Sequence, residues 1–194
     1  LAFQDDELAR KEIYQFMFGS DILVAPIYQS GTHRSVYLPD GIWFDFWNGE
    51  KYDGEQTFEI HAPLDKIPMF VKAGAIIPML PDDIGTLIPR HKKMSPEIKA
   101  IDDDLTRILE IWPGEKGALK TYEGVSANFE HKAGKTIMTI GTEQKRPIVI
   151  RLRNQKIELE PENGTRHYDE NERMTIIRLK SFAGERELTW SERD

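Results

Sequence analysis

The sequence predicts an all-β fold, in which two antiparallel β-sandwich domains follow one helix. Short apolar runs recur along most of the chain at intervals of about ten residues, as they do in sandwiches and barrels. The connections between these runs are short and rich in Gly, Pro, Asn and Asp, the residues that form tight turns. Helical periodicity is confined to one segment near the N-terminus. A chain of 194 residues is long enough for one large or two small domains.

The predicted helix covers residues 5–18. Asp5 and Asp6 stand at its start, where acidic side chains favour a helix N-terminus. Apolar residues follow at spacings near i, i+4 and i+8, namely Leu8, Ala9, Ile13, Phe16 and Met17. Gly19 ends the pattern and is interpreted as a helix C-cap.

A first group of strands is predicted between residues 20 and 80. The runs lie at 22–25, 36–38, 42–47, 57–62, 68–72 and 75–79. The run at 42–47 is followed by Asn48-Gly49, a dipeptide that favours the positive φ angles of a two-residue hairpin turn. Ala73-Gly74 separates the last two runs. We therefore expect one small sandwich over 20–80.

A linker and a second sandwich complete the predicted organisation. Residues 81–104 contain prolines and charged residues without apolar periodicity, which indicates a linker. Strands resume at 105–112, 118–122, 135–140, 148–153, 156–159, 174–179 and 187–190. The expected domains are thus 1–19 with the helix, 20–80, and 105–194 after the linker at 81–104.

Composition and charge exclude several functional classes. The formal net charge is −7, and acidic and basic residues are interleaved, so the chain offers no basic patch for nucleic acid. The absence of cysteine excludes disulfides and thiolate metal sites. No apolar run approaches the roughly 20 residues that span a bilayer, so we expect no membrane partner. The chain starts at Leu1, without Met or a signal segment, which indicates a piece of a longer polypeptide and leaves localisation unpredicted.

Candidate metal and cofactor sites are not evident. The five histidines, at 33, 61, 91, 131 and 167, lack ligand spacing, so we expect structural or surface roles and neither a metal nor a cofactor. The triplet at 102–104, three aspartates, lacks the spaced oxygen ligands and the glycine of a calcium loop. We interpret it as a solvated turn before the strand at 105.

The aromatic segment at 42–47 is the strongest candidate for binding. In a strand Phe44 and Phe46 fall on one face, whereas Trp43 and Trp47 fall on the other. We expect Phe44 and Phe46 to fill the core, so that Trp43 and Trp47 either pack on a neighbouring domain or serve as flat platforms for sugar rings. Large exposed apolar patches are unusual on monomers, which favours packing over sugar binding.

Four segments resemble the region that follows the barrel in glycoside hydrolase family 31. They are QFMFGSDILVAP at 15–26, VYLP at 36–39, WFDFWNG at 43–49 and APLDKIPMFVKAGAIIPM at 62–79. LEIWPG at 109–114 and Tyr122-Glu123 resemble the family's distal sandwich more weakly, and Gly124-Val125-Ser126 replaces its usual acidic turn.

The resemblance implies a non-catalytic portion of a retaining α-glycosidase. Residues 1–19 would then be a remnant of the last helix of a (β/α)8 barrel, and the two sandwiches would brace that barrel. Such enzymes need a nucleophilic carboxylate and an acid/base carboxyl on the barrel, upstream of this sequence. No catalytic residue is therefore expected here. The implied partners are the barrel and an α-glycoside such as an α-glucoside or α-xyloside.

Overall fold

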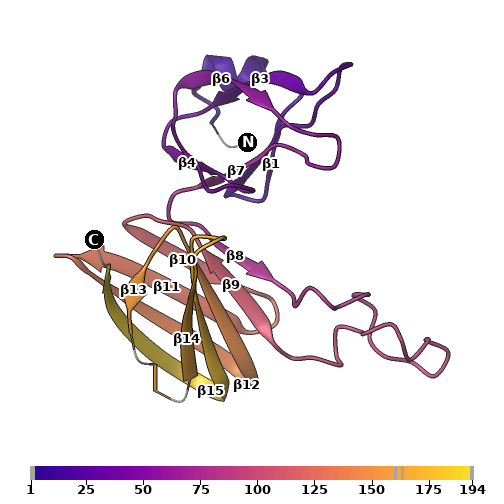
Figure 1. Ribbon diagram of the computed structural model, residues 1–194, viewed down its shortest axis with the longest axis vertical. Coiled ribbons are helices and arrows are strands. Elements are labelled where there is room, and N and C mark those ends of the chain that lie inside the picture. The colour runs from indigo at the N-terminus through magenta and orange to yellow at the C-terminus, as the bar shows by residue number, and fades with distance from the viewer. Residues whose placement is uncertain (1–2, 160, 163, 193–194) are drawn as a thin grey trace. The chain divides into compact units, whose positions relative to one another are not determined.

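The computed structural model describes residues 3–159, 161–162 and 164–192, and the chain forms two compact units (Figure 1). Unit 1 comprises Leu1–Ala75 and unit 2 comprises Ile76–Asp194. The division therefore falls before residue 76, not within 80–104 as the sequence pattern predicts. The reason is β8 (Ile76–Met79), which pairs antiparallel with β9 (Arg107–Ile111) and so belongs to unit 2. The segment at 80–104 belongs to unit 2 and connects β8 to β9.

The N-terminal helix is much shorter than the pattern at 5–18 predicts. Helix α1 covers Glu7–Lys11, with Asp6 as the N-cap whose carboxylate accepts from the amides of Leu8 and Ala9, each at 2.9 Å. Glu12 already has extended backbone angles. Because α1 buries none of its residues, no packing within unit 1 extends it further. No helix in the described part of the chain is long and apolar enough to cross a membrane.

Residues after α1 form a hairpin in place of the predicted helix. Strand β1 (Phe16–Phe18) pairs antiparallel with β2 (Ile22–Val24), and Phe16 lies opposite Val24. Gly19 has a φ of +68° and lies between β1 and β2, so it serves the hairpin turn; the residues before it form a strand, so it does not cap a helix. The apolar spacing of 16 and 17 fits a helix and a strand equally well, and pairing with β2 decides between them.

Unit 1 is a small sandwich of two sheets. Its other strands are β3 (His33–Leu38), β4 (Ile42–Asp45), β5 (Lys51–Asp53), β6 (Gln56–His61) and β7 (Met69–Lys72). One sheet has the order β1-β2-β7-β4-β5, and β3 pairs with β6 in the second sheet. The buried core draws on both sheets and consists of Leu23, Ala25, Val36, Leu38, Trp43, Ile60 and Phe70.

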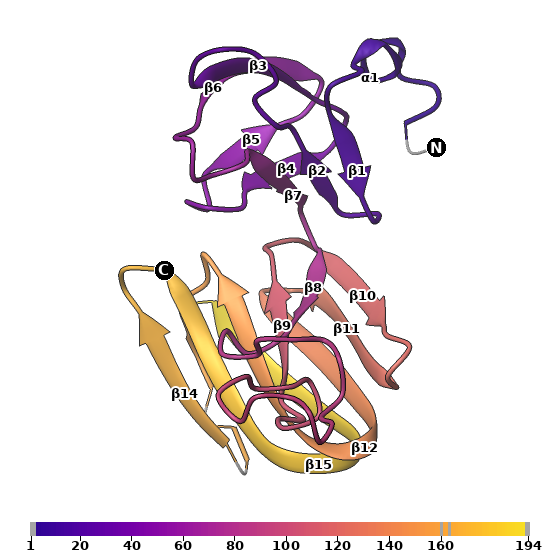
Figure 2. The same ribbon diagram turned by 90° about the vertical axis from the view of Figure 1, so that its right-hand side faces the viewer.

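Unit 2 is built around two very long strands (Figure 2). Strands β12 (Lys135–Arg153) and β15 (Met174–Glu192) each span 19 residues and pair antiparallel along most of their length. The remaining strands are β10 (Lys116–Lys120), β11 (Val125–Lys132), β13 (Ile157–Glu158) and β14 (Gly164–Asp169). Strand β11 pairs with the first half of β12, and β9 pairs with its second half in parallel. That parallel pairing is an exception to the predicted antiparallel arrangement.

Register shifts near the middle of β12 divide its pairing with β15 into two regular parts. The β12–β15 ladder is irregular between Thr142 and Arg146 and again between Arg146 and Ile148. β-Bulges of this kind bend a strand and increase its twist. One buried cluster collects side chains from both halves, including Met138 and Ile140 before the bend and Ile150 after it. The sheet thus curls over a single core.

Candidate functional site

Strand β4 contributes Trp43 to the core cluster of unit 1, although the sequence pattern predicts that Trp43 points away from the core. Trp43 is fully buried among Leu23, Val36 and Phe70, and its Nε1–H donates to the Pro39 carbonyl at 2.8 Å. Phe44 alternates to the opposite face of the sheet. Phe44 is also buried, outside the cluster around Trp43, and Phe46 is partly buried. The expectation that Trp43 faces away from the core is therefore wrong. A ring with no exposed surface has no access to a sugar.

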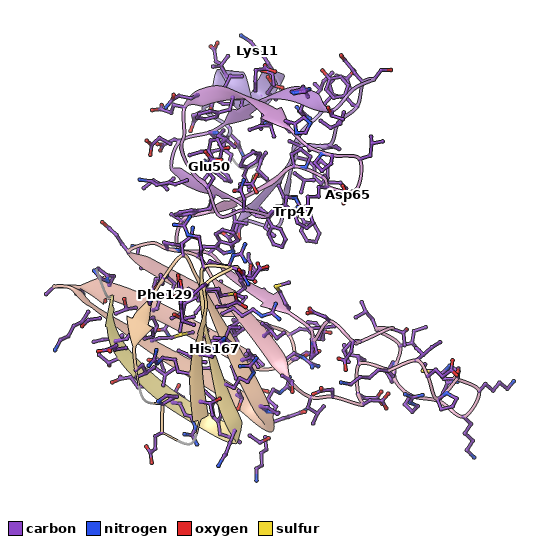
Figure 3. The ribbon with its side chains drawn as sticks, viewed as in Figure 1. Lys11, Trp47, Glu50, Asp65, Phe129 and His167 are labelled. Atoms are coloured by element: carbon purple, nitrogen blue, oxygen red, sulfur yellow. The ribbon has the colours of Figure 1, made fainter. Side chains whose placement is uncertain are left out.

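Trp47 lies outside the strand and is the accessible member of the predicted pair. The strand ends at Asp45, whose Oδ1 accepts from the amides of Trp47 at 2.7 Å and Asn48 at 3.0 Å. The indole of Trp47 is 40% exposed and its Nε1–H donates to the Ile67 carbonyl at 2.7 Å. In Figure 3 it lies on the same side of unit 1 as Asp65, away from Lys11 of α1.

Trp47 is held by contacts that limit access to its ring. Phe46 meets it edge-on at an interplanar angle of 85°, and the ammonium of Lys66 lies 5.5 Å from the ring centre. A sugar that stacked on the Lys66 side would have to displace this cation–π contact. The turn after β4 therefore positions Trp47 as part of a local cluster.

The segment 13–18, which we call the apolar segment, exposes large side chains. Ile13, Tyr14, Phe16 and Phe18 are all exposed, Phe18 to 68%. Tyr14 stacks on the exposed Tyr28 with ring centres 3.9 Å apart and an interplanar angle of 13°. The predicted helix concealed this surface, because a helix over 5–18 would have turned these residues to different sides. Concentrated exposed apolar side chains of this kind mark interaction surfaces.

The backbone behind the apolar segment is fixed by Arg34. This buried guanidinium donates through Nη1 to the carbonyls of Tyr14 at 2.9 Å and Pro26 at 2.8 Å. Burial lowers the pKa of Arg34. Gln15 adds a hydrogen bond from Nε2 to the Tyr37 carbonyl at 2.7 Å. The exposed side chains of the apolar segment therefore stand on an anchored backbone.

Tyr37 connects α1 to strand β3. Its hydroxyl donates to Oδ2 of Asp6, the helix N-cap, at 2.8 Å. Burial, together with this carboxylate, raises the pKa of Tyr37 to about 12, so the phenol stays protonated. The hydrogen bonds from Ala9 and Tyr37 in turn lower the pKa of Asp6. The helix start is thus attached to strand β3 through this polar contact, and Phe3 just before it packs on the core beside Trp43.

Unit 2 contains a mainly apolar pocket of about 440 Å³ beside β9, β10 and β11. Its lining comprises Pro78, Met79, Leu80, Leu87, Ile101, Arg107, Leu109, Leu119, Lys120, Thr121, Tyr122, Glu123 and Val125. Tyr122 stands at the pocket with 95% of its surface exposed. Arg107 and Glu123 pair inside the lining, Nε to Oε2 at 2.6 Å. Glu123 also accepts from the buried Arg146 at 3.1 Å, and the hydrogen bond from Arg107 lowers its pKa.

Other carboxylates of unit 2 also have structural partners. Glu110 is buried with Arg151 and Arg153 at 4.0 and 3.9 Å, and burial raises its pKa. In the triplet at 102–104, Asp104 accepts from Thr106 and from Lys99, and these bonds lower its pKa to about 2. Asp103 pairs with Arg90 and accepts from the Ala100 amide. The triplet lies in a turn before β9, as the sequence predicts, and its carboxylates form ion pairs with Arg90 and Lys99 of the 80–104 segment.

Comparison with known proteins assigns the chain to a family. Residues 1–77 match the model of the glycosyl hydrolase family 31 C-terminal domain. An α-xylosidase of Saccharolobus solfataricus is 30% identical over 161 residues, which are 81% of this chain and 20% of that protein. An isomaltosyltransferase of Sporosarcina globispora is 47% identical over 66 residues, 34% of this chain and 6% of that protein. The chain thus spans about a fifth or less of these relatives.

Solved structures show the same fold over both units. A family 31 dextranase of Flavobacterium johnsoniae, complexed with glucose, matches 98% of this chain and 28% of its own, with a TM-score of 0.73 and 22% identity. The likeness covers unit 2 as well as the part that the family model matches. The chain therefore belongs to glycosyl hydrolase family 31 and corresponds to the C-terminal β-sandwich region of that family.

Proposed function

We propose that the chain is the non-catalytic C-terminal portion of a retaining α-glycosidase and braces a catalytic (β/α)8 barrel of the same polypeptide. The substrate of the whole enzyme is an α-glucoside or a related α-glycoside such as an α-xyloside. The observation that carries the proposal is the apolar segment, where four large side chains are exposed within residues 13–18. On a monomer such a surface favours a docked partner.

The N-terminal region supports the barrel as that partner. Helix α1 covers five residues and buries none of them, so it makes no core of its own with unit 1. Leu8 is exposed on it, and the exposed Ile13 lies two residues beyond its end. Helix α1 would be what remains of the barrel's last helix, whose apolar side packs on barrel strands, whereas residues 16–18 belong to the sandwich as strand β1. The apolar segment follows α1 in the chain and would be covered by the same partner.

The chemistry of retaining glycosidases explains why this portion is not the catalyst. Cleavage requires two carboxyl groups about 5–5.5 Å apart on either side of the scissile bond, held on a rigid frame. In a barrel such groups stand at the C-terminal ends of strands. Glu110 and Glu123, the partly or fully buried glutamates described above, are each neutralised by two arginines and serve the fold.

The test compares the chain with a longer polypeptide that includes the barrel. The 194-residue chain should not hydrolyse aryl α-glucosides or α-xylosides above the uncatalysed rate, because enzymatic gains of about 10⁶ or more depend on positioned catalytic groups. The double change Phe16→Ser and Phe18→Ser should shorten the thermal half-life of the longer polypeptide while leaving the circular dichroism of the isolated chain unchanged.

Leu64→Ser is the matched control, because Leu64 is also an exposed apolar residue of unit 1 but lies outside the apolar segment. It should leave the half-life of the longer polypeptide unchanged. Hydrolysis by the isolated chain that vanished on changing one Asp or Glu would overturn the proposal. Equal half-lives of the double variant and the parent would remove the bracing role.

A second candidate function is carbohydrate binding through Trp47. The exposed indole is the observation in its favour, whereas the burial of Trp43 removes the other half of the predicted platform. Maltooligosaccharides at millimolar concentration should leave the tryptophan fluorescence of the chain unchanged. A saturable change that Trp47→Ala abolishes without loss of folding would make sugar binding the leading function.

A further inference from the structure

His33 and His61 face each other on the outer side of the smaller sheet of unit 1. They are register partners, at the start of β3 and at the end of β6. Their ring centres lie 4.6 Å apart with an interplanar angle of 54°, and both residues are exposed. The two positions are far apart in the sequence, which is why their spacing gave no sign of a shared site.

The hydrogen-bond pattern explains why the two rings are so close. The Ala62 amide donates to the Thr32 carbonyl at 2.8 Å, so Thr32 and Ala62 form a hydrogen-bonded pair. His33 and His61, one residue along the ladder, are therefore a non-hydrogen-bonded pair. In antiparallel sheets such pairs bring the side chains closer together than hydrogen-bonded pairs do.

The surroundings favour a cation beside these rings. Nδ1 of His33 lies 3.3 Å from the hydroxyl of Thr32, a contact that restrains the ring and leaves Nε2 available. His33 and Glu12 both line a cavity of about 320 Å³. Glu59, the register partner of Ser35, adds a second carboxylate on the same outward face. The nearby Arg34 directs its guanidinium to backbone carbonyls.

Two adjacent neutral imidazoles form a chelating pair for borderline metal ions. Imidazole nitrogen binds Zn²⁺ at about 2.0–2.1 Å, and rings whose centres are 4.6 Å apart can each direct one nitrogen to a shared ion. Imidazole suits Zn²⁺, Ni²⁺ and Cu²⁺, whereas Mg²⁺ prefers oxygen ligands. Among the described residues no group of three or more potential ligands is assembled, so water would complete the coordination.

We propose that His33 and His61 together bind one divalent transition-metal ion of the Zn²⁺, Ni²⁺ or Cu²⁺ class. Strands β3 and β6 alone make up the smaller sheet, so the ion joins the two strands of one complete layer of the sandwich. An ion that binds the folded state and not the separated strands stabilises unit 1 by mass action. The inference does not depend on the identity of the glycoside or on the barrel.

The experiment is a titration of the full 194-residue chain with Ni²⁺, followed by imidazole ¹H–¹⁵N spectra. Ni²⁺ should broaden the signals of His33 and His61 at one equivalent, before those of other histidines. Changing either residue to Ala should weaken Ni²⁺ binding about tenfold or more. Zn²⁺ should compete for the site, and an excess of Mg²⁺ should not. The thermal transition of unit 1 should rise with Ni²⁺ in the parent chain.

His167→Ala is the matched control, because His167 is a strand histidine on β14 of unit 2. It should retain the Ni²⁺ affinity of the parent. His61→Thr, which keeps a strand-forming residue, replaces His61→Ala if that variant does not fold. Unchanged Ni²⁺ affinity in folded variants of both His33 and His61, or displacement of Ni²⁺ by Mg²⁺, would overturn the proposal.

Discussion

At the residue scale, Trp43 joins the core of unit 1 to its hairpins. The indole packs among core side chains from both sheets, and its N–H donates a hydrogen bond to the Pro39 carbonyl. Gly54 approaches the same carbonyl so closely that a Cβ built on Gly54 would lie 2.1 Å from the oxygen. The Gly54 amide in turn donates to the Gly41 carbonyl at 2.8 Å. The Pro39 carbonyl, in the β3–β4 connection, thus contacts both the core and the β5–β6 connection.

Replacement of Trp43 should therefore destabilise unit 1 strongly. Trp43→Ala removes a fully buried ring, which commonly costs about 3–5 kcal/mol. Trp47→Ala is the comparison and should cost less, about 1–2 kcal/mol, because Trp47 is 40% exposed and loses one hydrogen bond and one aromatic contact. Urea unfolding followed by far-ultraviolet circular dichroism measures both. Similar losses for the two variants would contradict the assignment of Trp43 to the core.

In unit 2, Glu123 is a residue whose replacement should destabilise the fold, because its carboxylate pairs with both Arg107 and Arg146. Glu123→Gln should cost about 3 kcal/mol, because it leaves the buried charge of Arg146 without a carboxylate. Glu130→Gln, which breaks an exposed pair with Lys132, should cost less than about 1 kcal/mol. Equal effects in urea unfolding would show that the Arg107–Glu123–Arg146 group contributes no more than a surface pair.

The same group predicts a pH dependence of stability. The pKa of Glu123 is lowered in the folded state, so its contribution is present above the ordinary glutamate value of about 4.3 and is lost as the pH falls below it. The parent chain should therefore lose more stability between pH 5 and pH 3 than Glu123→Gln does. Parallel pH profiles of unfolding free energy for the two proteins would refute this assignment.

At the element scale, β8 decides where unit 2 begins. Ile76 lies in the buried cluster of unit 2 and pairs with Ile111 of β9. Residues 76–194 should therefore fold alone. Residues 81–194, which follow the boundary expected from sequence, should have a lower unfolding midpoint and a greater tendency to aggregate, because they lack β8 and expose the edge of β9. Equal midpoints of the two fragments would show that β8 is dispensable.

Patterns in the sequence predict most strands but not how long they run. The runs at 135–140 and 148–153 are recognised separately, because polar residues near Glu143 and Lys145 interrupt the apolar alternation. In the structure they form one strand, β12, whose irregular pairing falls in this polar stretch. Strands β11 and β14 were not predicted, because alternation with polar residues such as Asn128 and Glu130 is weaker than a continuous apolar run.

Sequence periodicity does not determine which side chains of the apolar segment, of the turn after β4 and of the β3–β6 pair lie together. The spacing of 13, 16 and 17 is compatible with a helix, and only the pairing of β1 with β2 shows that Phe16 and Phe18 share an exposed side. Likewise, alternation assigns Trp43 and Trp47 to one face, but the strand ends at Asp45 and the turn directs Trp47 elsewhere. The His33–His61 pairing required the register of β3 and β6.

At the scale of the whole molecule, the two units have separate cores. The buried cluster of unit 1 and that of unit 2 share no residue. Calorimetry should therefore resolve two unfolding transitions, and Trp43→Ala should lower one of them and leave the other in place. The variant Glu123→Gln should have the converse effect. A single transition that both variants lower equally would show that the units unfold together.

The two long strands of unit 2 also order events during synthesis. Strand β15, Met174–Glu192, pairs with β12, β13 and β14, and it supplies Ile177, Leu188 and Trp190 to the core. Unit 1 can fold as soon as residues 1–75 leave the ribosome, because its strands are complete by then. Unit 2 has to wait for nearly the last residue of this chain, with the apolar side of β12 uncovered in the meantime. A nascent chain stalled before Met174 is thus the form most dependent on chaperones.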